Sequence, residues 1–335
     1  MNSDILRLSV RNLSTSFMTD RGRVVSVADV SFDIPAGHTL ALVGESGSGK
    51  SVTSLGLMGL HGKNSQAIVG GEAWFVRRDG KRVDLLALPE KEKRRLRGNE
   101  LAMIFQEPMT SLNPVLTVGE QIAETVRLHS GMDRGQALRH AKKMLDLVEI
   151  PAAERRLREY PHQLSGGMRQ RVMIALAMAC NPTLLIADEP TTALDVTIQA
   201  QILALIQRLR KETGMSVLFI THNLGVVAQY ADHVAVMYAG RIIETAAVVP
   251  LFAAPRHPYT RGLLACLPGM AARGLAAGGA RPRLTAISGQ VCSPFDPPAG
   301  CAFAPRCPQR AERCDAAMPP LASLGAGRQA RCVRI

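Results

Sequence analysis

The sequence lacks any apolar run long enough to cross a membrane. Its longest apolar stretch, residues 172–180, ends at Asn181 and Pro182, whereas a spanning helix needs roughly 18 or more apolar residues. The first residues, MNSD, also lack the basic and apolar regions of a signal peptide. We therefore expect a cytoplasmic protein that reaches a membrane only through a partner.

Acidic residues and lysine are scarce in the last quarter of the chain. Residues 251–335 hold 11 arginines, no lysine and three acidic side chains, so they carry eight of the 12 net positive charges. Such a basic segment can bind nucleic acid or anionic lipid. It can also neutralise an acidic group within the protein, and composition leaves both interpretations open.

The sequence has no C-x₂-C pair, in which two residues separate the cysteines. Structural zinc sites usually contain such a pair. Four of the seven cysteines nevertheless fall within 23 residues, and these are Cys292, Cys301, Cys307 and Cys314. In a cytosolic protein such a group indicates metal or cluster ligands before disulfides. The spacing leaves an iron–sulfur cluster, zinc and unligated thiols open. We interpret Cys180 as a small core residue of an apolar helix, and Cys266 and Cys332 as isolated.

The rest of the composition is that of a globular protein, with 47% hydrophobic and 20% charged residues, and the length of 335 residues predicts about two domains. Apolar periodicity predicts strands at 5–10, 25–34, 101–105, 184–187 and 216–220, helices at 117–131, 134–149 and 196–212, a helix ending at Cys180, and a hairpin at 232–243. Residues 269–283 have the Gly, Ala and Arg composition of a flexible linker. The cysteine segment beyond it is too short and polar to fold on hydrophobic burial alone.

One motif predicts nucleoside triphosphate binding. Residues 44–51 match the phosphate-loop pattern G-x-x-x-x-G-K-[ST] between an apolar strand at 40–43 and a helical run. The glycines let several N–H groups converge on one anion, and the helix N-terminus adds positive potential. Lysine then neutralises the phosphates, and the last serine ligates Mg²⁺. The loop residues are Gly44, Glu45, Ser46, Gly47, Ser48, Gly49, Lys50 and Ser51.

Two further motifs indicate hydrolysis by paired subunits. The strand at 184–187 ends in Asp188, a Mg²⁺ ligand, and Glu189, which is placed to polarise the attacking water. The sequence LSGGMRQ at 164–170 predicts a second anion-binding helix N-terminus, with Ser165 as hydroxyl donor. One chain needs one γ-phosphate site, so the second motif is expected to serve the nucleotide of another subunit.

This series of motifs resembles the nucleotide-binding subunit of an ABC transporter over roughly residues 5–250. The segments QEPMTSLNP at 106–114 and HPYTR at 257–261, with the cysteine segment, resemble the oligopeptide/dipeptide (peptide/nickel) importer branch. The resemblance implies an α/β fold, with a P-loop NTPase core of the ABC type that combines a parallel sheet with an antiparallel β subdomain. It also implies an ATPase domain at 1–255, a helical subdomain at about 108–165, and a cysteine-containing extension at 256–335.

The resemblance further implies roles for residues around the nucleotide. Phe17 would stack on adenine, and the loop at 44–51 would hold the phosphates. Gln106 would contact Mg²⁺ and the lytic water and couple the site to a membrane partner. Asp188 would support Mg²⁺, and Glu189 would act as general base.

The same resemblance implies contacts across a subunit interface. Ser165, Gly166 and Gly167 would bind the γ-phosphate of the ATP held by the opposite subunit. Asp195 would line that interface, and His222 would touch the γ-phosphate. No position in these motifs departs from the family pattern, so we expect a hydrolysis-competent subunit.

The resemblance implies that this subunit belongs to an importer complex and lies at the cytoplasmic face of the inner or plasma membrane. Two ATPase subunits, expected to be paralogues in a heterodimer, would close around two ATP molecules and drive two permease subunits. The helices between Gln106 and Ser165 would receive the permease, and an extracytoplasmic solute-binding protein would act indirectly. For the cysteine segment the resemblance favours a [4Fe–4S] cluster over zinc. Arg306, Arg310 and Arg313 would offset the negative charge of that cluster, which lowers the expectation of nucleic-acid binding.

The expected function is ATP-driven uptake of di- and oligopeptides. An alternative is import of nickel or another small solute by the same machinery. An alternative of another class is a soluble ABC ATPase acting on nucleic acid, which the basic excess supports. Against it, the chain holds one ATPase core and an insert between Gln106 and Ser165 that is too short for a long coiled-coil arm.

Overall fold

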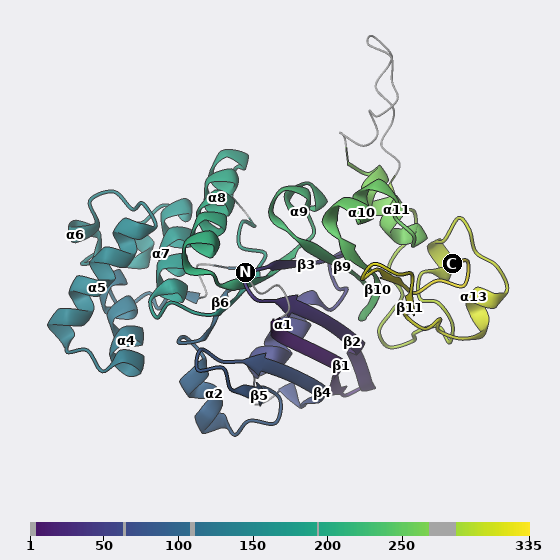
Figure 1. Cartoon of the computed structure of the whole chain (residues 1–335), viewed down its shortest axis with the longest axis horizontal. Helices are drawn as coiled ribbons and strands as arrows, with labels where there is room; N and C mark the ends of the chain where they lie inside the picture. The colour runs from purple at the N-terminus through teal and green to yellow at the C-terminus, as the bar shows by residue number, and fades with distance from the viewer. Residues whose placement is uncertain (1–4, 63–64, 108–110, 193, 268–285) are drawn as a thin grey trace, which may run out of the picture. The chain divides into compact units, whose positions relative to one another are not determined.

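A computed structural model describes residues 5–62, 65–107, 111–192, 194–267 and 286–335 (Figure 1). The predicted linker at 269–283 and Ala193 lie outside these residues. The chain divides into two compact units. Unit 1 comprises Met1–Ser9, Asp33–Thr39 and Trp74–Ile220, and unit 2 comprises Val10–Phe32, Leu40–Ala73 and Thr221–Ile335.

Unit 1 contains three parallel strands whose side chains are almost all buried. They are β6 (Leu101–Ile104), β7 (Leu184–Asp188) and β8 (Ser216–Thr221). Strand β7 lies between the other two, with Leu184 opposite Leu101 on one side and Ser216 on the other. Near-continuous apolar runs form such strands because helices cover both faces of a parallel sheet. The predicted strands are confirmed, except that Phe105 falls outside β6 and is 38% exposed.

The helices that the structure describes in unit 1 lie between residues 90 and 213. They are α2 (Glu90–Leu96), α4 (Val118–Ser130), α5 (Arg134–Leu147), α6 (Ala153–Arg156), η2 (Pro161–Gln163), α7 (Gly166–Met178) and α8 (Val196–Thr213). Helices α4, α5 and α7 pack against one another (Figure 1). Ile122, Val126 and Leu145 are buried at helical spacing. Thr117 caps α4 and Asp133 begins α5 in a capping box, so both predicted helices are confirmed.

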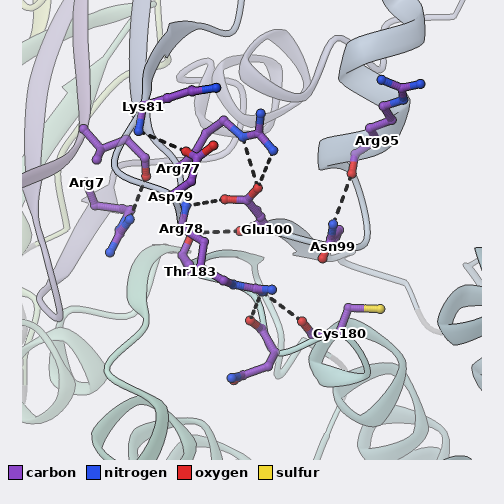
Figure 2. A network of polar contacts seen from close by, with 12 residues as sticks. Arg7, Arg77, Arg78, Asp79, Lys81, Arg95, Asn99, Glu100, Cys180 and Thr183 are labelled. Atoms are coloured by element: carbon purple, nitrogen blue, oxygen red, sulfur yellow. Dashed lines mark hydrogen bonds and ion pairs between the residues drawn. The ribbon is translucent and has the colours of Figure 1, made fainter. Parts of the chain in front are cut away.

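A buried carboxylate ties a hairpin of unit 1 to the start of its parallel strands (Figure 2). Glu100 is 4% exposed, and its Oε1 accepts hydrogen bonds from Arg77 Nε at 3.1 Å and Nη2 at 2.9 Å. The other oxygen accepts the backbone N–H of Arg78. The Arg78 guanidinium in turn donates to the carbonyl of Cys180 at 3.1 Å. Cys180 is half-buried and lies beyond the end of α7, so the prediction that it is a core residue within that helix is wrong.

Unit 2 holds most of a four-stranded sheet and a second group of strands. The four-stranded sheet has the order β2 (Gly22–Pro35), β1 (Leu6–Thr19), β4 (Ala67–Val76), β5 (Arg82–Asp84), with β4 and β5 antiparallel, and its last strand belongs to unit 1. In the second group, β3 (Thr39–Val43) runs parallel to β9 (His233–Tyr238), which forms the predicted hairpin with β10 (Arg241–Ala247). The far edge of β10 pairs with β12 (Gln329–Ala330), followed by β11 (Ala322–Ser323).

The C-terminal extension shares the core of unit 2. Its helices are α11 (Pro258–Ala265), η3 (Ala304–Arg306) and α13 (Arg313–Ala316), which follow α1 (Lys50–Met58), α9 (Leu224–Tyr230) and α10 (Val248–Ala253) in this unit. The buried rings of Tyr238, Tyr259 and Phe303 lie 4.7–5.4 Å apart, so the extension packs directly on β9. The segment therefore does not depend on a core of its own. None of the helices in the described ranges combines the length and apolarity needed to cross a bilayer.

Candidate functional site

The phosphate loop of unit 2 connects a buried strand to a helix. Strand β3 ends at Val43, and α1 begins at Lys50. Gly49 has φ of 99°, and a Cβ atom there would lie 2.6 Å from the Ser26 carbonyl oxygen. A Cβ atom on Gly44 would collide with the Met237 carbonyl. The loop therefore requires glycine at both positions, one for its conformation and one for the close approach of β9.

Lys50 lies across this loop. Its side chain is buried, and Nζ donates hydrogen bonds to the carbonyl oxygens of Gly44 at 2.8 Å and Glu45 at 3.0 Å. The Ser48 N–H also donates to the Glu45 carbonyl at 3.2 Å. The Lys50 ammonium group, held over a curled backbone at the N-terminus of a helix, is well placed to bind the phosphates of a nucleotide.

Glu45 is held by two residues of the C-terminal extension. Its N–H donates to Tyr259 Oη at 2.9 Å. Its carboxylate accepts two hydrogen bonds from Arg306, at 2.7 and 3.1 Å. Sequence reasoning assigned neither residue to the nucleotide site, although Tyr259 lies in the HPYTR segment that carried the resemblance. Arg306 was expected to neutralise cysteine ligands, and that prediction is wrong because its guanidinium pairs with Glu45.

Phe17 and His222 are the other predicted nucleotide contacts of unit 2. Phe17 is half-buried, and its ring meets His61 edge-on with centroids 5.5 Å apart. Burial lowers the pKa of His61, which disfavours the charged form of the ring beside Phe17. His222 follows β8 directly and is exposed.

The acidic half of the predicted site lies in unit 1. Strand β7 ends at the buried Asp188, and Glu189 follows with φ of 45°. Gln106 Nε2 donates to Glu189 Oε2 at 3.2 Å, and Thr192 Oγ1 donates to the same oxygen at 3.0 Å. The structure thus brings Gln106 and Glu189 together across 83 positions of sequence. A carboxylate oriented in this way can accept a proton from water.

The second predicted anion site begins α7. Ser165 is its N-cap, and Oγ accepts from the Met168 N–H at 3.4 Å. Ser165 and Gly166 are exposed, as required for contact with another subunit. Asp195 is exposed as well and caps α8, where Oδ1 accepts from the Ile198 N–H at 3.0 Å. Asp195 therefore has a local structural role whether or not it lines an interface.

A small cavity in the C-terminal extension differs from the predicted cysteine site. It is lined by Cys301, Cys307, Cys314 and Cys332, together with His257 and Phe303. Cys332, interpreted as isolated, is part of this lining, and Cys292 is not. Burial raises the pKa of the Cys301 and Cys307 thiols, and the neighbouring Cys314 and Cys332 raise it further.

The described side chains do not form a metal-binding group, and this holds for an iron–sulfur cluster as much as for zinc. Within the part of the chain that the structure describes, no group of three or more His, Cys, Asp or Glu side chains is arranged to hold a metal ion. Arg310, expected to offset charge at the cysteines, pairs with Asp315 at 3.0 Å. Arg313 donates to the Val333 carbonyl at 3.4 Å. The three arginines of this segment are thus engaged with protein oxygens.

Comparison with known proteins gives matches along nearly the whole chain. A sequence model of ABC transporters matches residues 27–192, and a model of the C-terminal region of oligopeptide/dipeptide transporters matches residues 243–314. A putative peptide import ATP-binding protein of Brucella melitensis is 54% identical over 333 residues, which cover 98% of this chain and 96% of the relative. The oligopeptide transport ATP-binding protein AppD of Bacillus subtilis is 50% identical over 325 residues, covering 97% and 95%.

Solved structures show the same core. A dimeric ATP-binding cassette in a post-hydrolysis state, bound to ADP and Pi, superposes with a TM-score of 0.62 at 26% identity. The match covers 72% of this chain and 98% of that cassette. The α/β core predicted from the motifs is thereby confirmed.

Proposed function

Because the chain belongs to the ABC transporter family, in its oligopeptide/dipeptide branch, we propose that it is the ATP-hydrolysing subunit that powers uptake of di- and oligopeptides. The observation that carries the proposal is the phosphate loop, in which Lys50 lies over the carbonyls of Gly44 and Glu45 at the start of α1. Full-length similarity to proteins named for peptide import supports peptides as cargo. Nickel uptake and action on nucleic acid are not favoured.

Within this proposal, residues 44–51 hold the triphosphate, and Phe17 stacks on adenine. Ser51, Gln106 and Asp188 would supply oxygen ligands of the kind that Mg²⁺ prefers, and the bound ion would supply positive charge to the phosphates. Glu189 takes a proton from the attacking water. The hydrogen bonds from Gln106 and Thr192 support this role because they fix the direction of the carboxylate.

We further propose that two such ATPase subunits, paralogous to each other, close on two ATP molecules. The exposed start of α7, with Ser165, Gly166 and Gly167, would contact the γ-phosphate held by the other subunit, with Asp195 nearby and His222 on the side of the bound nucleotide. The dimeric form of the similar cassette supports this arrangement. In this scheme residues 1–255 form the ATPase domain and residues 256–335 the extension.

Closure of the pair would move two permease subunits, which the helices between Gln106 and Ser165 receive at the cytoplasmic face of the membrane. A solute-binding protein outside would deliver the peptide. The names of the relatives, all ATP-binding proteins of import or transport systems, support these partners. Cargo choice belongs to the binding protein and the permeases rather than to this chain.

A [4Fe–4S] cluster in the C-terminal extension is a separate proposal. Its support is that Cys301, Cys307, Cys314 and Cys332 line one cavity, because four thiolates are the usual ligands of such a cluster, although the described side chains are not arranged as a metal-binding group. Bound there, it would cross-link the residues around η3, helix α13 and the end of the chain, and add stability to a segment with little core of its own. The ligand set replaces Cys292 of the sequence-based prediction with Cys332.

Reconstitution with permease subunits of a peptide importer and a peptide-binding protein tests the transport function. Proteoliposomes that hold the complex are expected to accumulate a labelled oligopeptide with its binding protein and ATP, and to lose uptake with Lys50→Ala. Uptake that continues without ATP hydrolysis, or hydrolysis that peptide and binding protein never stimulate, would contradict the proposal.

A further inference from the structure

The C-terminal extension reaches the phosphate loop at Glu45. Arg306 Nη1 lies 2.7 Å from Glu45 Oε2, and Nη2 lies 3.1 Å from Oε1. This parallel pair of bonds joins residues 261 positions apart. Bidentate geometry of this kind fixes direction as well as distance, because a guanidinium and a carboxylate are both planar.

Arg306 is held rigidly on its own side of the pair. Its side chain is 6% exposed, against 28% for Glu45. Nε donates to the Ser288 carbonyl at 2.9 Å, and Nη1 also contacts Tyr238 Oη at 3.3 Å. The guanidinium lies over the rings of Tyr238 and Phe303, 5.8 and 6.0 Å from their centroids. A charge so enclosed is poorly screened by solvent, and its interaction with Glu45 is stronger than that of an exposed ion pair.

The backbone of Glu45 is fixed from two directions. Its N–H donates to Tyr259 Oη at 2.9 Å. Its carbonyl accepts from Lys50 Nζ at 3.0 Å. Tyr259 is fully buried in the aromatic core, so its hydroxyl has little freedom to move. The extension therefore fixes Glu45, whose carbonyl oxygen accepts the hydrogen bond that orients Lys50.

We propose that Arg306 and Tyr259 are positioning residues for the phosphate loop, through which the C-terminal extension sets the affinity for ATP. The proposal rests on the proposed ATPase function. Two physical effects contribute. The contacts hold the loop in one conformation before the nucleotide arrives, which lowers the ordering cost of binding. Arg306 also neutralises a carboxylate within the loop that would otherwise repel the phosphates.

The test is a double-mutant cycle on the purified full-length chain, with Kd for ATP measured by titration and kcat by steady-state hydrolysis. Arg306→Gln is expected to raise Kd for ATP by about tenfold, equivalent to about 1.4 kcal/mol, with kcat at saturating ATP little changed. Glu45→Gln with Arg306→Gln is expected to bind more tightly than Arg306→Gln alone, because the unpaired carboxylate is gone. Arg306→Lys should retain part of the affinity.

A matched control comes from the same segment. Arg310 pairs with Asp315, but its side chain is 54% exposed, and Arg310→Gln is expected to leave Kd unchanged. Tyr259→Phe removes the acceptor for the Glu45 N–H and should weaken ATP binding without changing any charge. Thermal unfolding of each variant reports whether the chain remains folded.

The outcomes separate this inference from the proposed function. Unchanged Kd in folded Arg306→Gln and Tyr259→Phe, with normal ATP binding by the native chain, would overturn the inference alone. A double variant no tighter than Arg306→Gln would overturn the charge effect. Absence of ATP binding in the native chain would instead overturn the proposed function.

Discussion

Gln106 donates a hydrogen bond from Nε2 to Glu189 Oε2 at 3.2 Å. Thr192 donates to the same oxygen at 3.0 Å, so two uncharged donors orient the carboxylate. Gln106 follows strand β6 and Glu189 follows the adjacent β7. Parallel strands end at the same edge of a sheet, which is why residues so distant in sequence meet there.

The role of Glu189 as proton acceptor is tested by Glu189→Gln. The amide keeps the size of the side chain but cannot take a proton, so turnover is expected to fall by about 10²–10⁴-fold. Binding of ATP should be retained, because the phosphate loop is untouched. Single-turnover hydrolysis and nucleotide titration measure the two quantities. The exposed Glu92→Gln in α2 serves as control, and hydrolysis at the native rate in Glu189→Gln would refute the base assignment.

Gly49→Ala tests the loop geometry. The new Cβ atom would lie 2.6 Å from the Ser26 carbonyl oxygen, at a φ of 99° that disfavours any side chain. The loop must then shift, and ATP affinity is expected to fall by more than about tenfold. Gly70→Ala is the matched control, since a Cβ atom there meets nothing within 4 Å. Equal ATP affinities for the two variants, measured by titration, would show that the loop tolerates the displacement.

Patterns within short stretches of the sequence predicted many of the helices and strands and the phosphate loop. Helices α4 and α5 were foreseen because Ile122, Val126 and Leu145 recur at the spacing that buries one face. The phosphate loop was predictable because its conformation depends on glycines within one short segment, at positions 44, 47 and 49. Phe105 shows the limit of this reasoning, since an apolar run continued one residue past the end of β6. The pattern of apolar residues does not show at which residue neighbouring segments stop burying a strand.

Contacts between distant segments were not predictable from spacing. Arg306 lies between two cysteines in sequence, so its charge was assigned to them, whereas its partner Glu45 is 261 positions away. Cys332 likewise lies beyond the group of four, and the return of the chain through β12 brings it to the cavity. In both cases spacing along the sequence does not show which distant segments pack together, since Arg306 contacts Glu45 and Tyr238 from η3, and the pairing of β12 with β10 precedes Cys332.

Glu100→Gln tests the buried network of unit 1. The variant loses the charge that pairs with Arg77 and places an amide N–H₂ against a donor, either the Arg77 guanidinium or the Arg78 N–H. Because Arg77 is 36% exposed and Glu100 5%, we expect a loss of about 2 kcal/mol in the free energy of unfolding, below the cost of breaking a fully buried pair. Chemical denaturation measures it, with the exposed Glu90→Gln as control. A loss equal to that of the control would show that the network contributes nothing specific.

The cysteine cavity predicts different outcomes for Cys332 and Cys292. If thiolates lining the cavity hold a [4Fe–4S] cluster, Cys332→Ser is expected to abolish most of the bound iron and acid-labile sulfide, whereas Cys292→Ser should retain both, because only the former residue lines the cavity. Anaerobic purification followed by iron and sulfide analysis provides the measurement, and loss of the visible absorption of the cluster is a second readout. Loss of iron in Cys292→Ser but not in Cys332→Ser would restore the ligand set read from sequence spacing. Iron absent from the native protein would remove the cluster from the proposed function while leaving the ATPase intact, since the phosphate loop and Glu189 lie outside this cavity.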